Sequence, residues 1–437
     1  MPKLIKSKEP QTAKKQKKFQ FQSPKGMHDI LPADQPWWDK IRKVSRDTAE
    51  FYNFLRIDTP MMEDQDLFTI AVGTDTDIIE KEMFYVKSRG KDRYALRPEC
   101  TAAIARSYIQ HGLSHLSQPV KLYYFGPMFR HEQPQAGRFR QFYQAGFEIL
   151  GGGLDAIYDA QAILASYRML EGLKIKGLLM QVNSIGCRIC RPHYKKKLSD
   201  YYKKHEKDVC ADCKRRLKTN PLRMLDCKNT ACLPFKEKSP SLLDSICVGC
   251  SAHLKLVLEY LDELALPYVL NPHLVRGLDY YSKTVFEIFA DGNNQALASG
   301  GRYDYLIEML GGRPTSGVGS AIGIERVVEA MKARGIAAPK TGKASVFLVY
   351  IGDLAKKKTL ALIEDFRKAG IDVQESFGKD LIKRQMQLAD KAEANLALIL
   401  GQKEVYEESA IIRDLKSGAQ ETVPLKRVIE EVKKRLK

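Results

Sequence analysis

The chain has 437 residues, 44% of them hydrophobic, and a formal net charge of +18. The length predicts two or three domains, and the composition is that of a globular protein and excludes a largely disordered one. No apolar run approaches the roughly 20 residues that cross a bilayer, and the Lys- and Gln-rich N-terminus lacks the apolar segment of a secretory signal. We therefore predict a cytoplasmic protein that does not span a membrane.

The positive charge is concentrated in two stretches. Residues 1–20 carry seven Lys and one acidic residue and lack hydrophobic periodicity, which predicts a disordered basic tail. Residues 187–232 carry fourteen Lys and Arg against five acidic residues. Charge localised in this way suits a polyphosphate partner, because neutralised phosphates release counterions. The alternative is that the charge serves solubility alone.

The folded part is predicted to begin near Phe21. Residues 35–55 are amphipathic and predict a long helix, and residues 54–64 predict a strand interrupted at Pro60. Residues 83–99 alternate as a hairpin does, and the chain turns helical from Thr101.

Residues 125–151 predict a second hairpin with an unusually charged loop. Its apolar ends flank Arg130, His131, Glu132, Gln135, Gly137, Arg138 and Arg140. A loop of this kind, held by a rigid sheet, suits a polyanion such as a nucleotide. A solvated loop tip without a ligand is the alternative.

Eight of the nine cysteines fall in four pairs: Cys187/Cys190, Cys210/Cys213, Cys227/Cys232 and Cys247/Cys250. The first two pairs are separated by 19 residues and the last two by 14, close to the spacing of four-thiolate zinc sites. Disulfides are disfavoured in the cytosol. The spacing predicts structural zinc but leaves open whether the pairs share ions sequentially or in a nested order.

The rest of the chain alternates strands and helices. A helix is predicted over 155–171 and a strand over 178–186, followed by the basic, Cys-rich segment. Sheet is predicted over 268–290, and a glycine-dense strand leads into a helix over 316–335. Residues 345–437 alternate strand and helix, which predicts a compact α/β domain with its own sheet.

Six segments carry a resemblance to one family. They are LRPECTA (96–102), FRHEQPQAGRFRQFYQAGFEILG (129–151), NPLRMLDCKN (220–229), LVRGLDYYSKTVFEI (274–288), SGGRYDYL (299–306) and GVGSAIGIERVV (317–328). In these segments and their order the chain resembles the histidyl-tRNA synthetases, which are class II aminoacyl-tRNA synthetases. Residues 125–151 resemble motif 2 of that class, and residues 54–64 resemble motif 1, which lies at a dimer interface.

The resemblance implies an α+β fold with an antiparallel-sheet catalytic domain, an inserted Cys-rich module and a C-terminal α/β anticodon-binding domain. The expected parts are a tail (1–20), the first catalytic part (21–183), the insertion (184–265), the second catalytic part (266–335), a linker (336–344) and the anticodon-binding domain (345–437).

It also implies ATP- and Mg²⁺-dependent ligation of L-histidine to tRNA(His) through an adenylate, by a homodimer. The implied catalytic residues are Arg130 and Arg276, and the ATP site comprises Arg130, Glu132, Phe142 and Arg326. The implied histidine site comprises Glu99, Thr101, Gln144, Glu148, Tyr280, Tyr281 and Tyr303, and Gln135 and Arg138 would meet the tRNA acceptor end.

Two other hypotheses compete with this one. A catalytically silent paralogue with a regulatory or RNA-binding role is disfavoured by the joint presence of Arg130, Arg276 and Arg326. A different class IIa synthetase is disfavoured by LVRGLDYY (274–281). The cysteine set departs from the pattern of the histidine enzymes, so zinc rests on spacing alone. Cys100 is interpreted as tolerated variation and not as a nucleophile.

Overall fold

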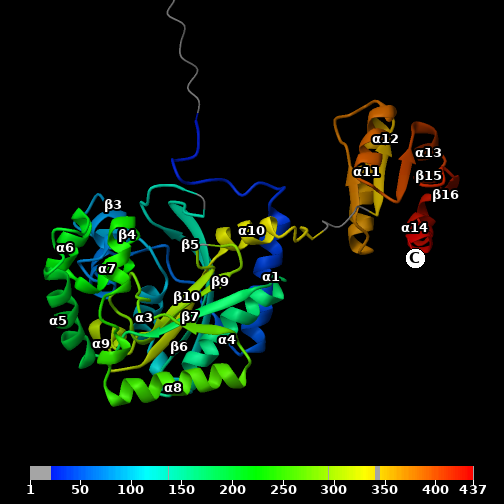
Figure 1. The fold of residues 1–437 in the computed structure, drawn as a ribbon. Helices are drawn as coiled ribbons and strands as arrows, with labels where there is room; N and C mark the ends of the chain where they lie inside the picture. The colour runs from blue at the N-terminus through cyan, green and yellow to red at the C-terminus, as the bar shows by residue number, and fades with distance from the viewer. Residues whose placement is uncertain (1–20, 136, 294, 340–344, 437) are drawn as a thin grey trace, which may run out of the picture. The chain divides into compact units, whose positions relative to one another are not determined.

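The computed structural model describes residues 21–135, 137–293, 295–339 and 345–436. It divides into two compact units, one ending at Ala338 and the other beginning at Pro339. The expected basic tail (1–20) and most of the expected linker lie outside the described residues. Figure 1 shows both units, and each is considered by itself.

An eight-stranded sheet forms the centre of the first unit, in the order β1-β5-β6-β11-β10-β9-β7-β8. Its strands are β1 (Leu55–Arg56), β5 (Val120–Phe129), β6 (Gln141–Leu150), β7 (Leu178–Ser184), β8 (Tyr268–Leu270), β9 (Ser282–Ala290), β10 (Ala298–Arg302) and β11 (Gly317–Gly323). The pairs from β5 to β7 are antiparallel, and only β1 and β8 join in parallel at the edges. The antiparallel sheet that the resemblance implies is thus present.

Helices cover both faces of this sheet (Figure 1). One apolar core joins it to α1 (Gln35–Phe51), α4 (Ile157–Gly172), α8 (Val248–Glu263) and α10 (Ile324–Ala333). The other core includes α2 (Gln65–Val72), α3 (Thr101–Gln110), α9 (Leu306–Met309) and the short helical turn η1 (Ile78–Glu82). A small sheet of β2 (Met62–Asp64), β4 (Arg93–Leu96) and β3 (Phe84–Lys87) flanks the second core. Another helical turn, η2 (Leu113–His115), follows α3.

The Cys-rich segment consists of short helices joined by turns and loops, and its described residues contain no strand. It contains α5 (Cys190–Lys203), α6 (Ala211–Thr219), α7 (Leu233–Glu237) and the helical turns η3 (Pro221–Asp226), η4 (Thr230–Cys232) and η5 (Leu243–Ser245). These helices gather at one end of the unit, near β3 and β4 (Figure 1). Residues of α5 and η3 share an apolar core with α2 and α3. The segment is therefore packed into the unit by a common core.

The prediction of sheet across 268–290 is wrong for its middle. Only β8 and β9 are strands, and residues 271–281 form a loop between them. Pro272 lacks the N–H that a ladder needs, and Asn271 closes a turn by accepting the backbone N–H of Leu274 at 3.0 Å. This loop carries three of the residues that the sequence assigned to the site.

The second unit contains a five-stranded sheet in the order β13-β12-β14-β15-β16. Its strands are β12 (Val346–Tyr350), β13 (Val373–Glu375), β14 (Leu396–Leu400), β15 (Ser409–Asp414) and β16 (Gln420–Pro424). Its helices are α11 (Asp353–Lys368), α12 (Ile382–Lys391), α13 (Gln402–Tyr406) and α14 (Val428–Leu436), with the turn η6 (Leu425–Arg427). Fully buried β12 and β14 join α11 and α14 in one core and α12 in another. Among the described residues, neither unit has a helix long and apolar enough to cross a membrane.

Candidate functional site

A cavity lies over the middle of the large sheet, on the face that carries α3. Its lining includes Arg130, Glu132, Arg138, Phe142, Gln144, Arg276, Tyr280, Tyr281, Glu99, Thr101 and Arg326. Eleven of the fourteen residues that the sequence assigned to amino-acid, ATP or tRNA binding thus border one space. They come from segments up to 227 positions apart in the chain, from Glu99 to Arg326.

The floor of the cavity follows from the strand register. Tyr124 on β5 pairs with Gly146, Gly146 with Ala321, Ala321 with Ser299, and Ser299 with Glu287. The three central residues have small side chains, whereas the two ends of the row carry a phenol and a carboxylate. The Tyr124 ring lies over Gly146, so the row leaves space above Ala321 and Ser299 and places polar groups at either side of it.

Arg130 and Arg326 lie on the lining of this space with their orientation fixed. Arg130 follows directly after β5, and its Nε donates to the Pro98 carbonyl at 2.9 Å. Its guanidinium carbon lies 5.4 Å from the centre of the Phe142 ring. Arg326 on α10 donates to the carbonyls of Gly137 at 3.1 Å and Ala296 at 3.0 Å.

Positive charge accumulates in the cavity. Burial lowers the pKa of Arg326, and the neighbouring charges of Arg138 and Arg130 lower it further, against the opposing effect of Glu132. Glu132 compensates part of this charge, because it accepts a hydrogen bond from Arg138 at 3.2 Å. Partly buried cations brought together in this way attract an anion of high charge.

Arg276 reaches the cavity from the 271–281 loop. It forms an ion pair with Glu287 and donates to Ser299 Oγ at 2.8 Å, so its guanidinium lies at the far end of the floor row. Its backbone carbonyl accepts a hydrogen bond from Arg223 at 3.2 Å. Both the side chain and the backbone of Arg276 are therefore held in place.

Two carboxylates are buried at the cavity, Glu99 within its lining and Glu148 behind it. Glu99 accepts the backbone N–H groups of Thr101 at 2.7 Å and Ala102 at 2.8 Å and so caps α3, and Tyr280 donates to it at 3.3 Å. Glu148 accepts the hydroxyls of Thr101, at 2.7 Å, and of Tyr303. Burial raises the pKa of Glu99, and it raises the pKa of Glu148 to about 8.

Three predicted residues do not line the cavity. Glu148 and Tyr303 lie behind the lining, and each is 1% exposed. Tyr303 donates to Glu148, and Glu148 accepts the hydroxyl of Thr101, which lines the cavity. Gln135 is exposed at the tip of the β5–β6 hairpin, where its backbone exchanges hydrogen bonds of 3.2 and 2.8 Å with Arg138.

Sequence reasoning missed Tyr124, Glu287 and Glu325. Glu287 could have been found as the one acidic residue in apolar β9, whereas Tyr124 is one aromatic residue in an aromatic run and gave no signal. Both oxygens of Glu325 accept the Tyr143 N–H, at 2.9 and 3.0 Å, and burial raises the pKa of Glu325 to about 7. Within the described chain, the buried Tyr124 hydroxyl and Gln144 Oε1 have no hydrogen-bond partner, which marks them as groups for a ligand to satisfy.

The paired cysteines form two clusters in nested order. Cys187, Cys190, Cys247 and Cys250 form an outer cluster, and Cys210, Cys213, Cys227 and Cys232 form an inner cluster. Within each cluster the sulfurs all lie within 4.8 Å of one another. Cys100 belongs to neither. Burial raises the pKa of its thiol to about 12, so the thiol stays protonated and unreactive at neutral pH.

Comparison with known proteins accords with this geometry. The family model for histidyl-tRNA synthetase matches residues 26–190 and 236–327, and the model for an anticodon binding domain matches residues 345–435. A histidine–tRNA ligase of Dehalococcoides mccartyi is 45% identical over 418 residues, which cover 95% of this chain and 100% of that protein. A histidine–tRNA ligase of Desulfitobacterium hafniense is 42% identical over 423 residues, with 95% and 99% covered.

A solved structure of apo histidyl-tRNA synthetase from S. aureus superposes with a TM-score of 0.78 at 33% identity and covers 95% of this chain and 100% of that one. The curated relatives and the solved structure both match this chain over nearly its whole length. The chain therefore belongs to the histidyl-tRNA synthetase family.

Proposed function

We propose that this enzyme ligates L-histidine to tRNA(His) with ATP, as a class II aminoacyl-tRNA synthetase acting in protein synthesis. The observation that carries the proposal is the division of one cavity into two chemistries. Arginines that are held by carbonyls and carboxylates border one part, and buried carboxylates with tyrosine hydroxyls lie beneath the other. The first part suits a triphosphate and the second an amino acid with a polar side chain.

In the first step, a carboxylate oxygen of histidine attacks the α-phosphorus of ATP, and pyrophosphate leaves. In the second, a ribose hydroxyl of tRNA attacks the activated carbonyl, and AMP leaves. Both steps need positioning and neutralisation of charge more than a covalent intermediate. Arg130 would bridge the α-phosphate and the histidine carboxylate, and Arg276 would approach the α-phosphate from the other side.

The adenine would lie between the Phe142 ring and the Arg326 guanidinium, with Glu132 at its amino group. The flat, partly buried surfaces of both side chains support this placement. Mg²⁺ bound to the phosphates would neutralise charge. Glu287 and Glu325 in the cavity lining would offer the hard oxygen ligands that this ion prefers, in exchange for their contacts with Arg276 and the Tyr143 N–H.

Histidine would be recognised by groups for its ammonium and for both imidazole nitrogens. Glu99, Thr101 and Gln144 would hold the ammonium end, and Glu148, Tyr280, Tyr281 and Tyr303 would form the imidazole end. Gln144 Oε1 is buried without a partner in the described chain, which fits an acceptor for the ammonium group. A pocket that pairs both ring nitrogens rejects apolar analogues, because its polar groups would stay unpaired.

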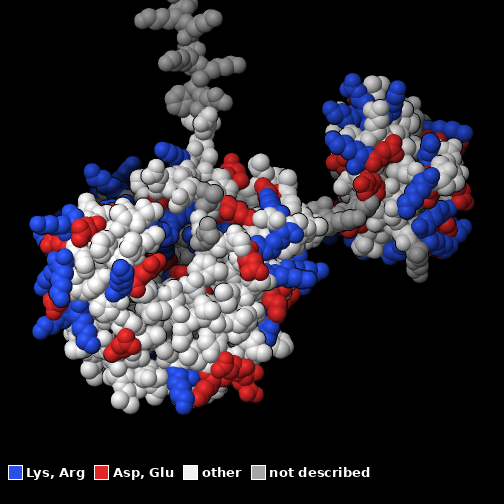
Figure 2. Space-filling model, viewed as in Figure 1, with Lys and Arg blue, Asp and Glu red and all other residues white. Residues whose placement is uncertain are grey.

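The tRNA would contact both units. Gln135 and Arg138 at the hairpin tip would meet the acceptor end, and the second unit would read unstacked bases of the anticodon loop. Figure 2 shows Lys and Arg side chains along the edge of the first unit where α5 lies. The exposed lysines there, Lys196, Lys197, Lys203, Lys204 and Lys207, would grip the phosphate backbone.

We further propose that the protein acts in the cytoplasm, where translation takes place. Two copies would associate there through the motif 1 region. Residues 51–70 carry several exposed apolar side chains: Phe51, Leu55, Met61, Met62 and Ile70, each 44 to 78% exposed. Exposed apolar side chains concentrated in one segment of the chain suit an isologous interface.

Exchange of labelled pyrophosphate into ATP tests the function. We expect exchange that depends on L-histidine and is not supported by other amino acids, followed by charging of tRNA(His). Exchange with a different amino acid would identify another synthetase. An absence of exchange, with tRNA binding retained, would identify a regulatory paralogue and overturn the proposal.

A further inference from the structure

Both cysteine clusters have the dimensions of a four-thiolate site for a single ion. In a tetrahedral site with zinc–sulfur bonds of about 2.3 Å, neighbouring sulfurs lie about 3.8 Å apart. In the outer cluster Cys187 Sγ lies 3.6 Å from Cys190 Sγ and 4.0 Å from Cys247 Sγ, and Cys190 Sγ lies 3.8 Å from Cys250 Sγ. In the inner cluster Cys210 Sγ lies 3.8 Å from Cys227 Sγ. These separations are far longer than the roughly 2.05 Å of a disulfide.

Backbone N–H groups point at the sulfurs of both clusters. The N–H of Cys247 donates to Cys190 Sγ at 3.0 Å, and the N–H of Cys210 donates to Cys232 Sγ at 3.2 Å. Such donors stabilise the negative charge of metal-bound thiolates. In each cluster three of the four cysteines are buried, so solvent is largely kept from the sulfurs.

We infer that each cluster holds one Zn²⁺, so that the chain carries two structural zinc ions in nested order. Four soft thiolates in a tetrahedron select zinc among common cellular ions. A four-iron cluster binds its four cysteines to four different irons and needs sulfurs farther apart than the 4.8 Å seen in each cluster. Four protein ligands would leave neither ion an open position for substrate, so both ions would have a structural role.

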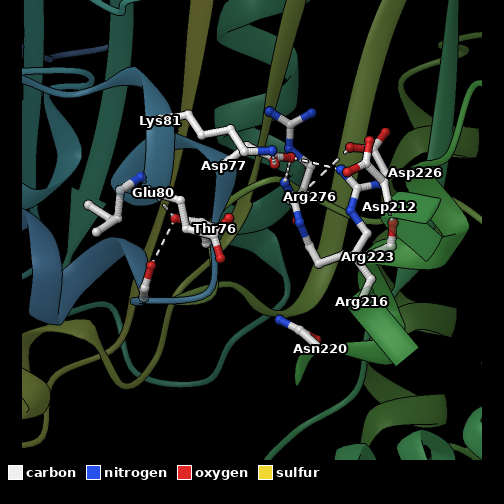
Figure 3. Close-up of polar contacts among 12 residues, drawn as sticks. Thr76, Asp77, Glu80, Lys81, Asp212, Arg216, Asn220, Arg223, Asp226 and Arg276 are labelled. Carbon is white, nitrogen blue, oxygen red and sulfur yellow. Dashed lines mark hydrogen bonds and ion pairs between the residues drawn. The ribbon is translucent and has the colours of Figure 1, made fainter. Parts of the chain in front are cut away.

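The inner ion would support the wall of the catalytic cavity. Its ligands bracket α6 and η3, and these carry Arg216 and Arg223, whose guanidiniums lie 2.8 and 3.4 Å from Asp77 Oδ2. Arg223 also holds the Arg276 carbonyl. Figure 3 shows Asp77, Arg216, Arg223 and Arg276 brought together. This positioning role of the inner ion rests on the proposed function.

Elemental analysis of the full-length protein tests the inference without reference to activity. The wild type should contain two zinc ions per chain, and its X-ray absorption should report four sulfur ligands at about 2.3 Å. The Cys100→Ser variant alters the ninth cysteine and should also contain two. One zinc or none in the wild type, or iron with visible absorbance, would overturn the inference.

Two double variants test the nested order. Cys187→Ser with Cys247→Ser removes two ligands of the outer cluster only, so one zinc should remain. Cys187→Ser with Cys210→Ser removes one ligand from each cluster, so both ions should be lost or weakened. The reverse pattern would show sequential pairing. Should either variant fail to fold, the wild type can decide between the two orders. Zinc is withdrawn stepwise from it, and alkylation maps which thiols lose their protection. The four cysteines that become reactive together share one ion.

The positioning role has its own measurement. Cys210→Ser with Cys232→Ser should lose the inner ion and lower kcat for pyrophosphate exchange about tenfold below the outer-cluster variant, with KM for histidine changed less than twofold. Equal kcat values for the two variants would refute the role while leaving the two ions in place. A wild type without exchange but with two zinc ions would refute only the proposed function.

Discussion

Glu148 is buried against the hydroxyls of Thr101 and Tyr303, and its pKa is raised from an ordinary value of 4.5 to about 8. Between these values the folded state binds more protons than the unfolded state, so stability falls as the pH rises. One such group contributes at most about 1.4 kcal/mol per pH unit. In Glu148→Gln, which resembles the protonated acid, we expect a flatter fall of Tm between about pH 5.5 and 7.5 in thermal melts. Identical slopes for variant and wild type would contradict the shift.

Arg130 and Arg276 are expected to act on the transition state more than on bound ATP. Arg276→Lys keeps a charge but loses the fork that engages both Glu287 and Ser299. We expect kcat for exchange to fall by about a hundredfold while KM for ATP changes less than threefold. We expect the same changes in kcat and KM for Arg130→Lys. The control is Arg313→Lys at an exposed position, which should change neither value. A change confined to KM would argue against this role.

Strand β11 shows how an element shapes the site from behind. A Cβ at Gly319 would overlap the Glu148 carboxylate and lie 2.9 Å from the Phe147 carbonyl, and the backbone carbonyl cannot give way. Gly319→Ala should therefore cost about 1 to 3 kcal/mol of stability, by overpacking, and weaken histidine binding. Thermal melts and KM for histidine measure these effects. Gly90→Ala is the control, because a Cβ at Gly90 would lie 3.5 Å from its nearest neighbouring atom. This variant should change neither the Tm nor the KM for histidine.

Asp77 joins η1 to α6 and η3. Its pKa is lowered by the charges of Arg216 and Arg223 although burial opposes this, and the Arg223 side chain is only 7% exposed. Asp77→Asn should leave Arg223 under-compensated, lowering Tm by a few degrees and kcat several-fold, with KM for histidine little changed. The exposed neighbour Asp75 provides the matched control, Asp75→Asn. A loss of Tm without any loss of kcat would limit Asp77 to a structural role.

Pattern and resemblance predicted elements well where the chain has a long amphipathic or apolar run, as for α1, α4, β6 and β12. They failed where tertiary contacts decide. The loop 271–281 contains strand-favouring Val275, Tyr280 and Tyr281, but Asn271 and Pro272 end the strand, and its backbone turns to present Arg276 and Tyr280 to the cavity. The position of Tyr124 depends on register with Gly146, which no local pattern contains. Likewise, spacing alone could not order the cysteine pairs, because nested pairing depends on how α5 and α8 meet.

At the scale of the whole molecule, we expect the two units to have separate roles, the first in histidine activation and the second in tRNA recognition. A chain ending at Ala338 retains the complete cavity lining, whereas the domain expected to read the anticodon is lost. We expect histidine-dependent pyrophosphate exchange within threefold of the wild type and at least a tenfold loss in kcat/KM for tRNA(His). A truncated chain that charges tRNA normally would show that the second unit does not contribute to recognition.

The strand order has a consequence for synthesis on the ribosome. β6 ends at Leu150, but β11, which pairs along its whole length, begins only at Gly317. A growing chain must therefore carry the β5–β6 hairpin with an open edge while 166 further residues are added. Exposed edges of this kind invite pairing with other chains. Nascent chains stalled between these two strands should accordingly depend on chaperones, and they should be unable to bind histidine until β11 has emerged.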